Sequence, residues 1–247
     1  MKKRRIAREV GLSDEIIEKI CLICDVDRES LEGFCHRMVF GQIVFWTSDH
    51  TVYATGFQLR DDVEEIPFHF HRIEVFTGYP MKVMDCTAFA IAGLSEDGEV
   101  FVHGNFLNTN FDELKKLEFG NNNLRDELCR GEMGEEGCDK IIDMKCGLDF
   151  IVLRTMNGRI LAAGCNTRGQ IGLGRDSPEW ISKITYVCTI RDIDYMLCGK
   201  YHTIVTVKNY SDVFCWGGCG DYFTCILSPQ RLSLLCQRKK KRKLNVK

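Results

Sequence analysis

The chain has 247 residues, of which 45% are hydrophobic and 10% aromatic, which is enough to bury the core of one large or two small domains and excludes disorder along the whole length. No run reaches the about 18 apolar residues that a membrane span requires, and the N-terminus lacks the apolar stretch of a secretory signal, so we expect a soluble, intracellular protein. The net charge of −2 conceals a division: residues 1–10 carry five Lys/Arg and one Glu, residues 238–247 carry seven Lys/Arg, and the body between them holds 21 basic and 34 acidic residues.

Basic tails are expected at both ends, over residues 1–12 and 237–247. Such tails are attracted to polyanions such as nucleic acid, whereas the acidic body suits a basic protein partner. Neither tail carries interleaved aromatic residues, so any nucleic-acid binding is expected to be non-specific, and a merely solvated tail is the alternative. The residues expected to serve nuclear import or phosphate contacts are Lys2, Lys3, Arg4, Arg5, Lys239, Lys240, Lys241, Arg242 and Lys243.

A short helical segment is expected at residues 13–36. Ser13 is suited to cap a helix N-terminus, and Asp14 and Glu15 favour its first turn. The apolar stripe that would bury one face of this helix is formed by Ile16, Ile17 and Ile20.

Potential metal ligands occur in two places, but we expect no metal site and no cofactor. Adjacent Cys and His rarely both reach one metal, which argues against zinc in the helical segment, and a solvated strand explains the second pair. The two sets are Cys21, Cys24, Cys35 and His36, and His69 with His71. The fourteen cysteines lie mostly inside apolar runs, which favours a reducing compartment with thiols used as small hydrophobic groups.

Residues 37–236 contain a repeated unit. Each copy gives an apolar strand, a polar turn and a second apolar strand that closes on glycine, and two of the turns, Asp97-Gly98 and Asn157-Gly158, are strong hairpin signals. The closing glycines, at 56, 104, 164 and 217, are 48, 60 and 53 residues apart. This spacing predicts one small antiparallel sheet per repeat that stacks on its neighbours, as propeller blades do. The copies are Phe40–Gly56, Met81–Gly104, Ile141–Gly164 and Arg191–Gly217, with turns at 48–50, 96–98, 156–158 and 209–211.

The glycine-rich run after the third copy could be mistaken for a phosphate-binding loop. Such a loop leads from a strand directly into a helix, whereas Gly169, Gly172 and Gly174 precede Pro178 and a further strand-like run. We therefore interpret these glycines as blade turns. Residues 105–137 are rich in Asn, Glu and Gly and are predicted to be an insertion between blades.

The repeats resemble those of the regulator of chromosome condensation family. The run from Asn166 to Gly174, NTRGQIGLG, matches the family's N-x-x-G-Q-L-G-L-G tail, and 199–203 and 213–217 match its two strands. The stretch EDGEVFVHGNF at 96–106 is similar to the branch formed by the chromatin-bound exchange factors of the small GTPase Ran. The resemblance implies an all-β fold, a β-propeller-like array of antiparallel blades that is reduced relative to the family's seven, with a short N-terminal helix.

The same resemblance implies the contact residues. Asp149 would contact Ran, and His202 would stand in for a contact histidine; the alternative for Asp149 is an aspartate that hydrogen-bonds its own strand end. The family has another acidic contact in the copy at 81–104. Counting back from the turn at Glu96 and Asp97 leads to Ala88 at that position, with Asp85 three residues earlier, so this acidic contact is expected to be missing. A projecting wedge that presses on the GTPase, or else an ordinary surface insertion, is expected at Asn105, Phe106, Asn108, Asn110 and Asp112.

The function implied is guanine-nucleotide exchange on Ran, in the nucleus and at chromatin. Exchange needs no covalent intermediate, and the partners would be Ran and, through the tails, histones or DNA phosphate. We expect no membrane partner and no small-molecule substrate. A non-catalytic propeller scaffold for protein interaction is the alternative, and a nucleic-acid-associated structural protein would depend on the tails alone.

Overall fold

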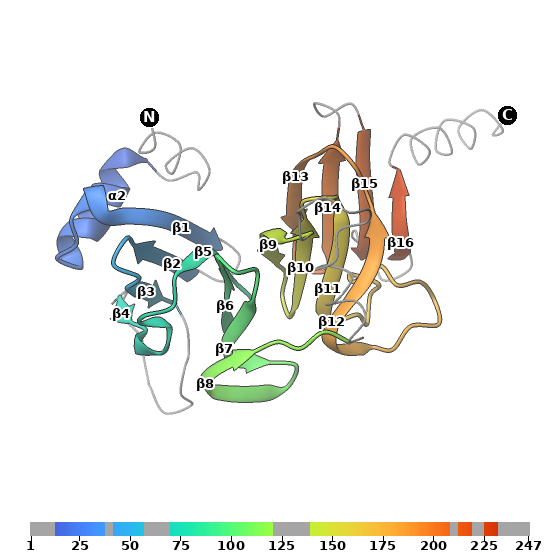
Figure 1. The fold of residues 1–247 in the computed structure, drawn as a ribbon, viewed down its shortest axis with the longest axis horizontal. Coiled ribbons are helices and arrows are strands. Elements are labelled where there is room, and N and C mark those ends of the chain that lie inside the picture. The colour runs from blue at the N-terminus through green and yellow to red at the C-terminus, as the bar shows by residue number, and fades with distance from the viewer. Residues whose placement is uncertain are drawn as a thin grey trace, which may run out of the picture. The chain divides into compact units, whose positions relative to one another are not determined.

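The computed structural model describes residues 13–37, 42–56, 70–120, 139–207, 212–218 and 225–231, and these residues form an all-β fold with one short α-helix (Figure 1). They fall into two units, residues 1–116 and 117–247, each containing two four-stranded antiparallel sheets. This confirms the predicted propeller-like array of antiparallel blades. Both basic tails lie outside the described residues.

The first unit contains blades 1 and 2. Their first strands lie side by side. Blade 1 comprises β1 (Leu31–Arg37), β2 (Gln42–Thr47), β3 (Val52–Thr55) and β4 (His71–Arg72), and blade 2 comprises β5 (Met81–Cys86), β6 (Ala90–Ser95), β7 (Val100–Phe106) and β8 (Thr109–Lys116).

The second unit contains blades 3 and 4, which pair their strands in the same order. Here too the first strands of the two blades are neighbours. Blade 3 comprises β9 (Ile141–Cys146), β10 (Phe150–Thr155), β11 (Arg159–Cys165) and β12 (Trp180–Thr189), and blade 4 comprises β13 (Ile193–Cys198), β14 (His202–Val207), β15 (Asp212–Gly218) and β16 (Cys225–Arg231).

The turns between the second and third strands of blades 1 to 3 share one geometry. In each, the N–H of the third turn residue donates to a carbonyl three residues earlier: His50 to Thr47, Gly98 to Ser95 and Gly158 to Thr155. That third residue has a positive φ of 65°, 82° and 79°, respectively. A type I turn followed by a left-handed residue is a common hairpin connection, so the sequence predicted these turns correctly. The corresponding turn of blade 4, at 209–211, lies outside the described residues.

The closing glycines hold each hairpin to the loop that precedes it. The residue after the glycine donates its N–H to a loop carbonyl in three blades, with distances of 2.9 Å to Phe89, 2.7 Å to Asp149 and 2.7 Å to Tyr201. The glycines have φ of +101°, +122° and +96°, and a Cβ on any of them would lie 2.6 Å or less from the same carbonyl oxygen. The repeat therefore closes on glycine because any side chain would collide with the loop. The glycines concerned are Gly104, Gly164 and Gly217.

The helix α2 (Asp14–Ile23) covers one face of blade 1. The Ser13 hydroxyl accepts from the N–H of Ile16, as predicted for an N-cap, and Ile17 and Ile20 are buried against Phe45. Ile16, expected in the same stripe, is exposed. The described helix is neither long nor apolar enough to span a membrane.

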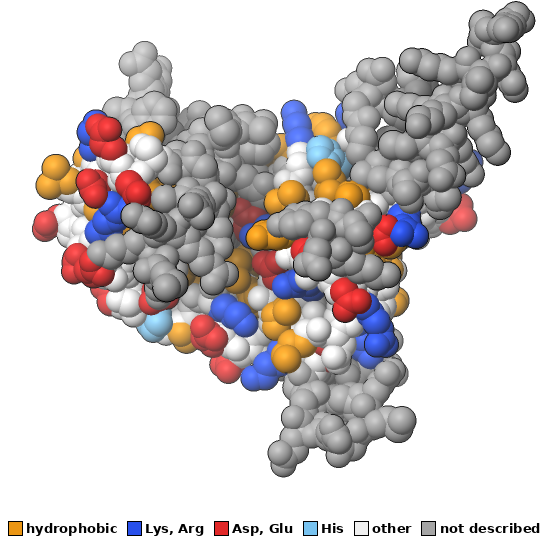
Figure 2. Space-filling model, turned by 90° about the horizontal axis from the view of Figure 1, so that it is seen from above, with side chains coloured by type: hydrophobic (Ala, Val, Ile, Leu, Met, Phe, Trp, Pro, Cys, Tyr) orange, Lys and Arg blue, Asp and Glu red, His pale blue; other side chains and the backbone are white. Residues whose placement is uncertain are grey.

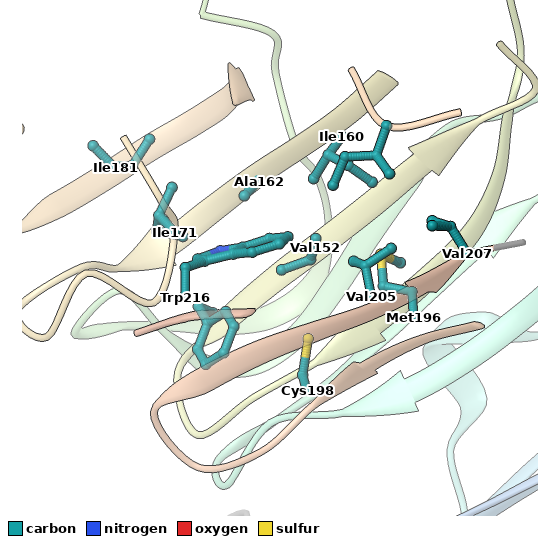
Figure 3. Close-up of a cluster of buried hydrophobic side chains, with 12 residues drawn as sticks. Val152, Ile160, Ala162, Ile171, Ile181, Met196, Cys198, Val205, Val207 and Trp216 are labelled. Carbon is teal, nitrogen blue, oxygen red and sulfur yellow. The ribbon is translucent and has the colours of Figure 1, made fainter. Parts of the chain in front are cut away.

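Two cores join neighbouring blades within the units. In the first unit, side chains of β2 and β3 meet those of β5, β6 and β7 around Trp46 and Phe76. In the second unit, Trp216 of β15 lies among side chains from both blades (Figure 3). The other labelled members of that core are Val152, Ile160, Ala162, Ile171, Ile181, Met196, Cys198, Val205 and Val207.

The glycine-rich run leads from β11 to β12, a strand, as predicted. Asn166 organises this loop, because its Oδ1 accepts from the N–H of Ile171 at 3.0 Å and its Nδ2 donates to the Ser177 hydroxyl at 2.7 Å. A Cβ at Gly172 would lie 2.8 Å from the Trp216 ring, so the loop must present bare backbone to blade 4. The motif thus joins two blades.

Two predicted boundaries are wrong. The helix ends at Ile23, and β1 begins at Leu31, so the first blade starts inside the segment expected to be helical over 13–36. The sequence around β1 lacks a clear alternation, which hid the strand. The insertion predicted at 105–137 begins with the end of β7 and the whole of β8, so its first part completes blade 2. Its part from 121 to 137 lies outside the described residues.

We predict that Gly164→Ala destabilises the protein more than Gly174→Ala. Both glycines have positive φ, and alanine there costs about 1–2 kcal/mol of backbone strain. A Cβ at Gly164 would also lie 2.4 Å from the Phe150 Cα, whereas nothing lies within 4 Å of a Cβ at Gly174. The overpacking adds about 1–3 kcal/mol at Gly164 alone. Urea unfolding followed by tryptophan fluorescence measures both losses, and equal losses would contradict the close-approach explanation.

We predict that His103 makes the protein less stable in mild acid. Burial lowers the pKa of His103, against smaller opposing effects of a hydrogen bond to the Phe111 backbone and of the Asp112 carboxylate. As the pH falls through about 6.5, the unfolded chain gains a proton before the folded one does, so stability is lost below that pH and unaffected above it.

The His103→Gln variant lacks this titrating group. Between about pH 7 and about pH 5, the midpoint of thermal unfolding should therefore fall less in the variant than in the wild type. His71→Gln, at an exposed position of β4, is the matched control for the loss of one imidazole. If the wild type and His103→Gln give the same pH dependence, the histidine has no part in it.

Candidate functional site

Three loops of the second unit leave the blades at one end, which we call the loop rim: 147–149, 166–179 and 199–201. The first two emerge together because Phe150, at the start of β10, lies opposite Gly164 near the end of β11. The third joins them through a backbone hydrogen bond of 3.1 Å from the N–H of Leu148 to the carbonyl of Lys200. Loops of two neighbouring blades are therefore held in one arrangement.

Asp149 is positioned by its backbone. It is half-buried, its carbonyl accepts from the N–H of Cys165, and the preceding residue bonds to the neighbouring blade. The loop therefore has little freedom to move, which lowers the entropic cost of binding a partner with this carboxylate. The prediction that Asp149 contacts a GTPase is compatible with this position and stays a prediction.

His202 has a packing role that the sequence did not reveal. A Cβ at Gly199 would lie 2.3 Å from the His202 ring, and a Cβ at Gly147 would lie 1.8 Å from the Phe150 ring. The two rings thus occupy equivalent places, each lying over the glycine three residues before it. Because phenylalanine does this in blade 3, the position does not require imidazole chemistry, and the contact role predicted for His202 gains no support from the geometry.

A cationic and aromatic cluster accompanies Asp149 on the loop rim. The Arg168 guanidinium lies over the Tyr201 ring, 4.2 Å from its centroid, and the Lys200 Nζ lies 5.1 Å from the same centroid. Such stacking holds an arginine in place. Sequence reasoning missed this cluster. Aligning blades 3 and 4 on the glycines that begin these loops, Gly147 and Gly199, places Tyr201 at the position of Asp149, a signal that could have found it.

The backbone hydrogen bonds correct the position of the missing acidic contact in blade 2. The carbonyls of Phe89, Asp149 and Tyr201 accept equivalent hydrogen bonds, so the counterpart of Asp149 is Phe89 and not Ala88. Ala88 is buried, whereas the Phe89 side chain is 59% exposed. Blade 2 therefore presents a large apolar side chain where blade 3 presents a carboxylate.

The wedge expected near residue 105 is a tight hairpin between β7 and β8. Leu107 and Asn108 have φ of 58° and 56°, so the two-residue turn is of type I′, which favours Asn. The Phe106 side chain is fully buried and anchors the hairpin, so it cannot be a contact residue as predicted. The remaining wedge residues, Asn105, Asn108, Asn110 and Asp112, are exposed, and the Asn110 Nδ2 donates to the Asp112 carboxylate at 2.9 Å.

The potential metal ligands of the helical segment lie in different places. Cys21 and Cys24 pack in the core beneath α2, where burial raises the pKa of both, that of Cys24 to about 11. Cys35 instead lies near Asp85 and Cys86. The His36 side chain and His69 lie outside what the structure describes, and His71 is exposed on β4.

The described surface carries no dominant charge on the face that Figure 2 shows, where acidic, basic and hydrophobic side chains are interspersed. The basic residues assigned to import or phosphate contacts all lie in tails outside the described residues. Their role therefore stays a prediction from the sequence.

Comparisons with known proteins support the repeat assignment. No family model matches the chain. The chain is 30% identical to the human probable E3 ubiquitin-protein ligase HERC6, over 43% of this chain and 12% of that protein. It is 28% identical to the mouse secretion-regulating guanine nucleotide exchange factor, over 51% of this chain and 25% of that protein. The chain thus spans a quarter or less of the length of these curated relatives, which carry repeats of the regulator of chromosome condensation type.

Solved structures show the same fold at low sequence identity. Human WBSCR16 matches with a TM-score of 0.59 and 16% identity, over 81% of this chain and 51% of that one. Yeast RCC1 (Prp20), in a structure with Kap60, matches with a TM-score of 0.58 and 14% identity, over 77% and 46%. Prp20p from Saccharomyces cerevisiae, in a structure described together with its binding to Gsp1p and histones, gives a TM-score of 0.51 and 16% identity, over 77% and 49%. The solved structures thus share the fold of this chain, and the curated relatives make it similar to proteins with repeats of the regulator of chromosome condensation type.

Proposed function

We propose that the protein is a guanine-nucleotide exchange factor for a small GTPase of the Ran type, which it binds at the loop rim. The observation that carries this proposal is the position of Asp149, on a loop held by backbone hydrogen bonds to its own blade and to the next. The similarity to a curated guanine nucleotide exchange factor supports it, as does the resemblance of residues 96–106 to exchange factors of Ran.

Exchange requires the protein to bind the nucleotide-free GTPase more tightly than the loaded one. No group on the protein has to form a covalent bond. A preorganised carboxylate at the rim can pair with a basic side chain of the GTPase. Binding energy gained only in the nucleotide-free complex then weakens nucleotide binding by the same amount, about 1.4 kcal/mol for each factor of ten.

The hairpin of β7 and β8 would act separately, as the element that displaces the nucleotide-binding segments of the GTPase. Its type I′ turn and the buried Phe106 side chain anchor it to blade 2. The exposed amides of Asn105, Asn108 and Asn110 offer both donors and acceptors to polar backbone.

The basic tails would hold the protein at chromatin in the nucleus. Histones are named with Prp20p, a structural neighbour, but the low identity restricts that likeness to the fold. The proposal for this chain therefore depends on its five cationic residues in 1–10 and seven in 238–247. Such clusters bind phosphate without reading base sequence.

A non-catalytic interaction scaffold is the second candidate, and specific observations favour it. Phe89 replaces the expected carboxylate in blade 2, His202 packs over a glycine, and Phe106 is buried. The rim would then bind a protein partner through Asp149 and the Arg168–Tyr201 stack without promoting nucleotide release.

We predict that Asp149→Asn slows exchange about tenfold to about a hundredfold. A hydrogen bond to a charged group contributes about 1.5–3 kcal/mol, and the amide keeps the shape of the side chain while it removes the charge. The measurement is the rate of release of a fluorescent GDP from Ran with catalytic amounts of the full chain.

Asp192→Asn is the matched control. Asp192 is exposed and precedes β13, at the opposite end of that strand from the loop rim, and its φ of 58° is a conformation that asparagine tolerates. An unchanged rate with Asp149→Asn would show that this carboxylate does not contact the GTPase. Ran binding without faster release by the wild type would establish the scaffold instead.

We predict that deletion of residues 238–247 weakens binding to duplex DNA and makes the remaining binding less sensitive to salt, because fewer counterions are released. Exchange in solution should be unaffected, since the loop rim lies in the blades. Titrations at several salt concentrations measure the slope. DNA binding that survives removal of both tails would overturn the assignment of phosphate contacts to them.

A further inference from the structure

Three potential metal ligands converge in the first unit, between the first strands of blades 1 and 2. The Cys35 Sγ on β1 lies 2.8 Å from the Asp85 Oδ1 and 3.8 Å from the Cys86 Sγ, both on β5. The three ligand atoms all lie within 4.8 Å of one another. Among the residues that the structure describes, this is the one place where three Cys, His, Asp or Glu side chains meet so closely.

The surroundings restrict access to this cluster without closing it. Asp85 and Cys86 are 4% and 1% exposed, and Cys35 is half-buried at the edge of the core that joins the two blades. The Asp85 carboxylate turns back along its own strand, so that its Oδ1 also accepts from the N–H of Cys86 at 2.8 Å. This bend brings two adjacent residues, which normally point to opposite faces of a strand, toward one point.

We propose that Cys35, Asp85 and Cys86 form a binding site for a zinc-like divalent metal ion that joins blade 1 to blade 2. Two thiolates bound at about 2.3 Å to a tetrahedral zinc ion lie about 3.8 Å apart. The two sulfur atoms already have this separation, 3.8 Å. A thiolate sulfur and a carboxylate oxygen bound to the same ion lie about 3.5 Å apart. The Asp85 Oδ1, now 2.8 Å from the Cys35 Sγ, would therefore have to move away from that sulfur by less than an ångström.

Binding exchanges two thiol protons, which pass to solvent, for one metal ion. The carboxylate and the two thiolates supply three ligands, and a water molecule at the open side of Cys35 supplies the fourth. The two thiols could instead be oxidised to a disulfide. The Cys35 and Cys86 sulfur atoms would then have to approach to about 2.05 Å, and the hydrogen bond from Cys35 to Asp85 would be lost. The observed spacing therefore favours a metal ion over a disulfide.

Cobalt(II) is the probe, because tetrahedral thiolate coordination gives it intense visible bands and a near-ultraviolet charge-transfer band. The full chain is reduced, stripped of metal with a chelator and titrated with cobalt, then with zinc as competitor. We expect one tetrahedral cobalt ion per chain, displaced by zinc. Cys35→Ser and Cys86→Ser should each abolish the tetrahedral cobalt spectrum. Asp85→Asn should weaken zinc binding by about tenfold or more.

Cys165→Ser is the matched control, because Cys165 is a half-buried thiol of the second unit, hydrogen-bonded to Thr167 and outside the cluster. It should retain the full cobalt spectrum. Absence of the tetrahedral spectrum in the wild type, or its persistence in both Cys35→Ser and Cys86→Ser, would overturn the proposal.

A second measurement needs no variant and so does not depend on whether the altered chains fold. Alkylation of the native wild-type chain, followed by peptide mapping, should show that zinc protects Cys35 and Cys86 and leaves Cys165 reactive. Equal alkylation of Cys35 with and without zinc would contradict the site. So would a Cys35–Cys86 disulfide that forms with hydrogen peroxide equally fast with and without zinc.

Discussion

In blades 2, 3 and 4, the backbone of the third strand passes close enough to the loop before the second strand to donate a hydrogen bond to it. The three equivalent bonds end on Phe89, Asp149 and Tyr201, at 2.7 to 2.9 Å. Only glycine permits this approach, because a Cβ would overlap the accepting carbonyl oxygen. The contact fixes where each loop leaves its blade, and thereby decides which side chain that loop presents.

The repeat could be predicted from the sequence because its signals are local. Asp97-Gly98 and Asn157-Gly158 specify hairpins by their own backbone preferences, and closing glycines at a regular spacing mark the ends of sheets. Ser13 predicted the start of the helix for the same reason, because an N-cap is a local preference of one residue. By contrast, β1 was hidden, since its residues acquire a clear burial pattern only through packing between α2 and the rest of blade 1.

The candidate site was harder to predict because it depends on register between blades. Counting from a turn placed the blade 2 position at Ala88, one residue away from Phe89, the residue whose carbonyl makes the equivalent bond. The sequence predicts Phe106 as a wedge residue, whereas the structure shows that its side chain is fully buried. The packing role of His202 becomes visible only when Phe150 is seen at the equivalent place, and its contact role stays a prediction. The Arg168–Tyr201 stack and the Cys35–Asp85–Cys86 cluster each join residues from two blades, and no local pattern brings them together.

The central claim is that these loops are held in place because the residue after each closing glycine donates a backbone hydrogen bond to its loop. Amide hydrogen exchange of the N–H groups of Asn105, Cys165 and Gly218 tests it directly, since these are the donors of the three bonds. The structure predicts that all three exchange slowly, at rates near those of amides in the central strands. Exchange at the rate of an unstructured chain would contradict the claim, because the loops would then have no fixed position from which to contact a partner.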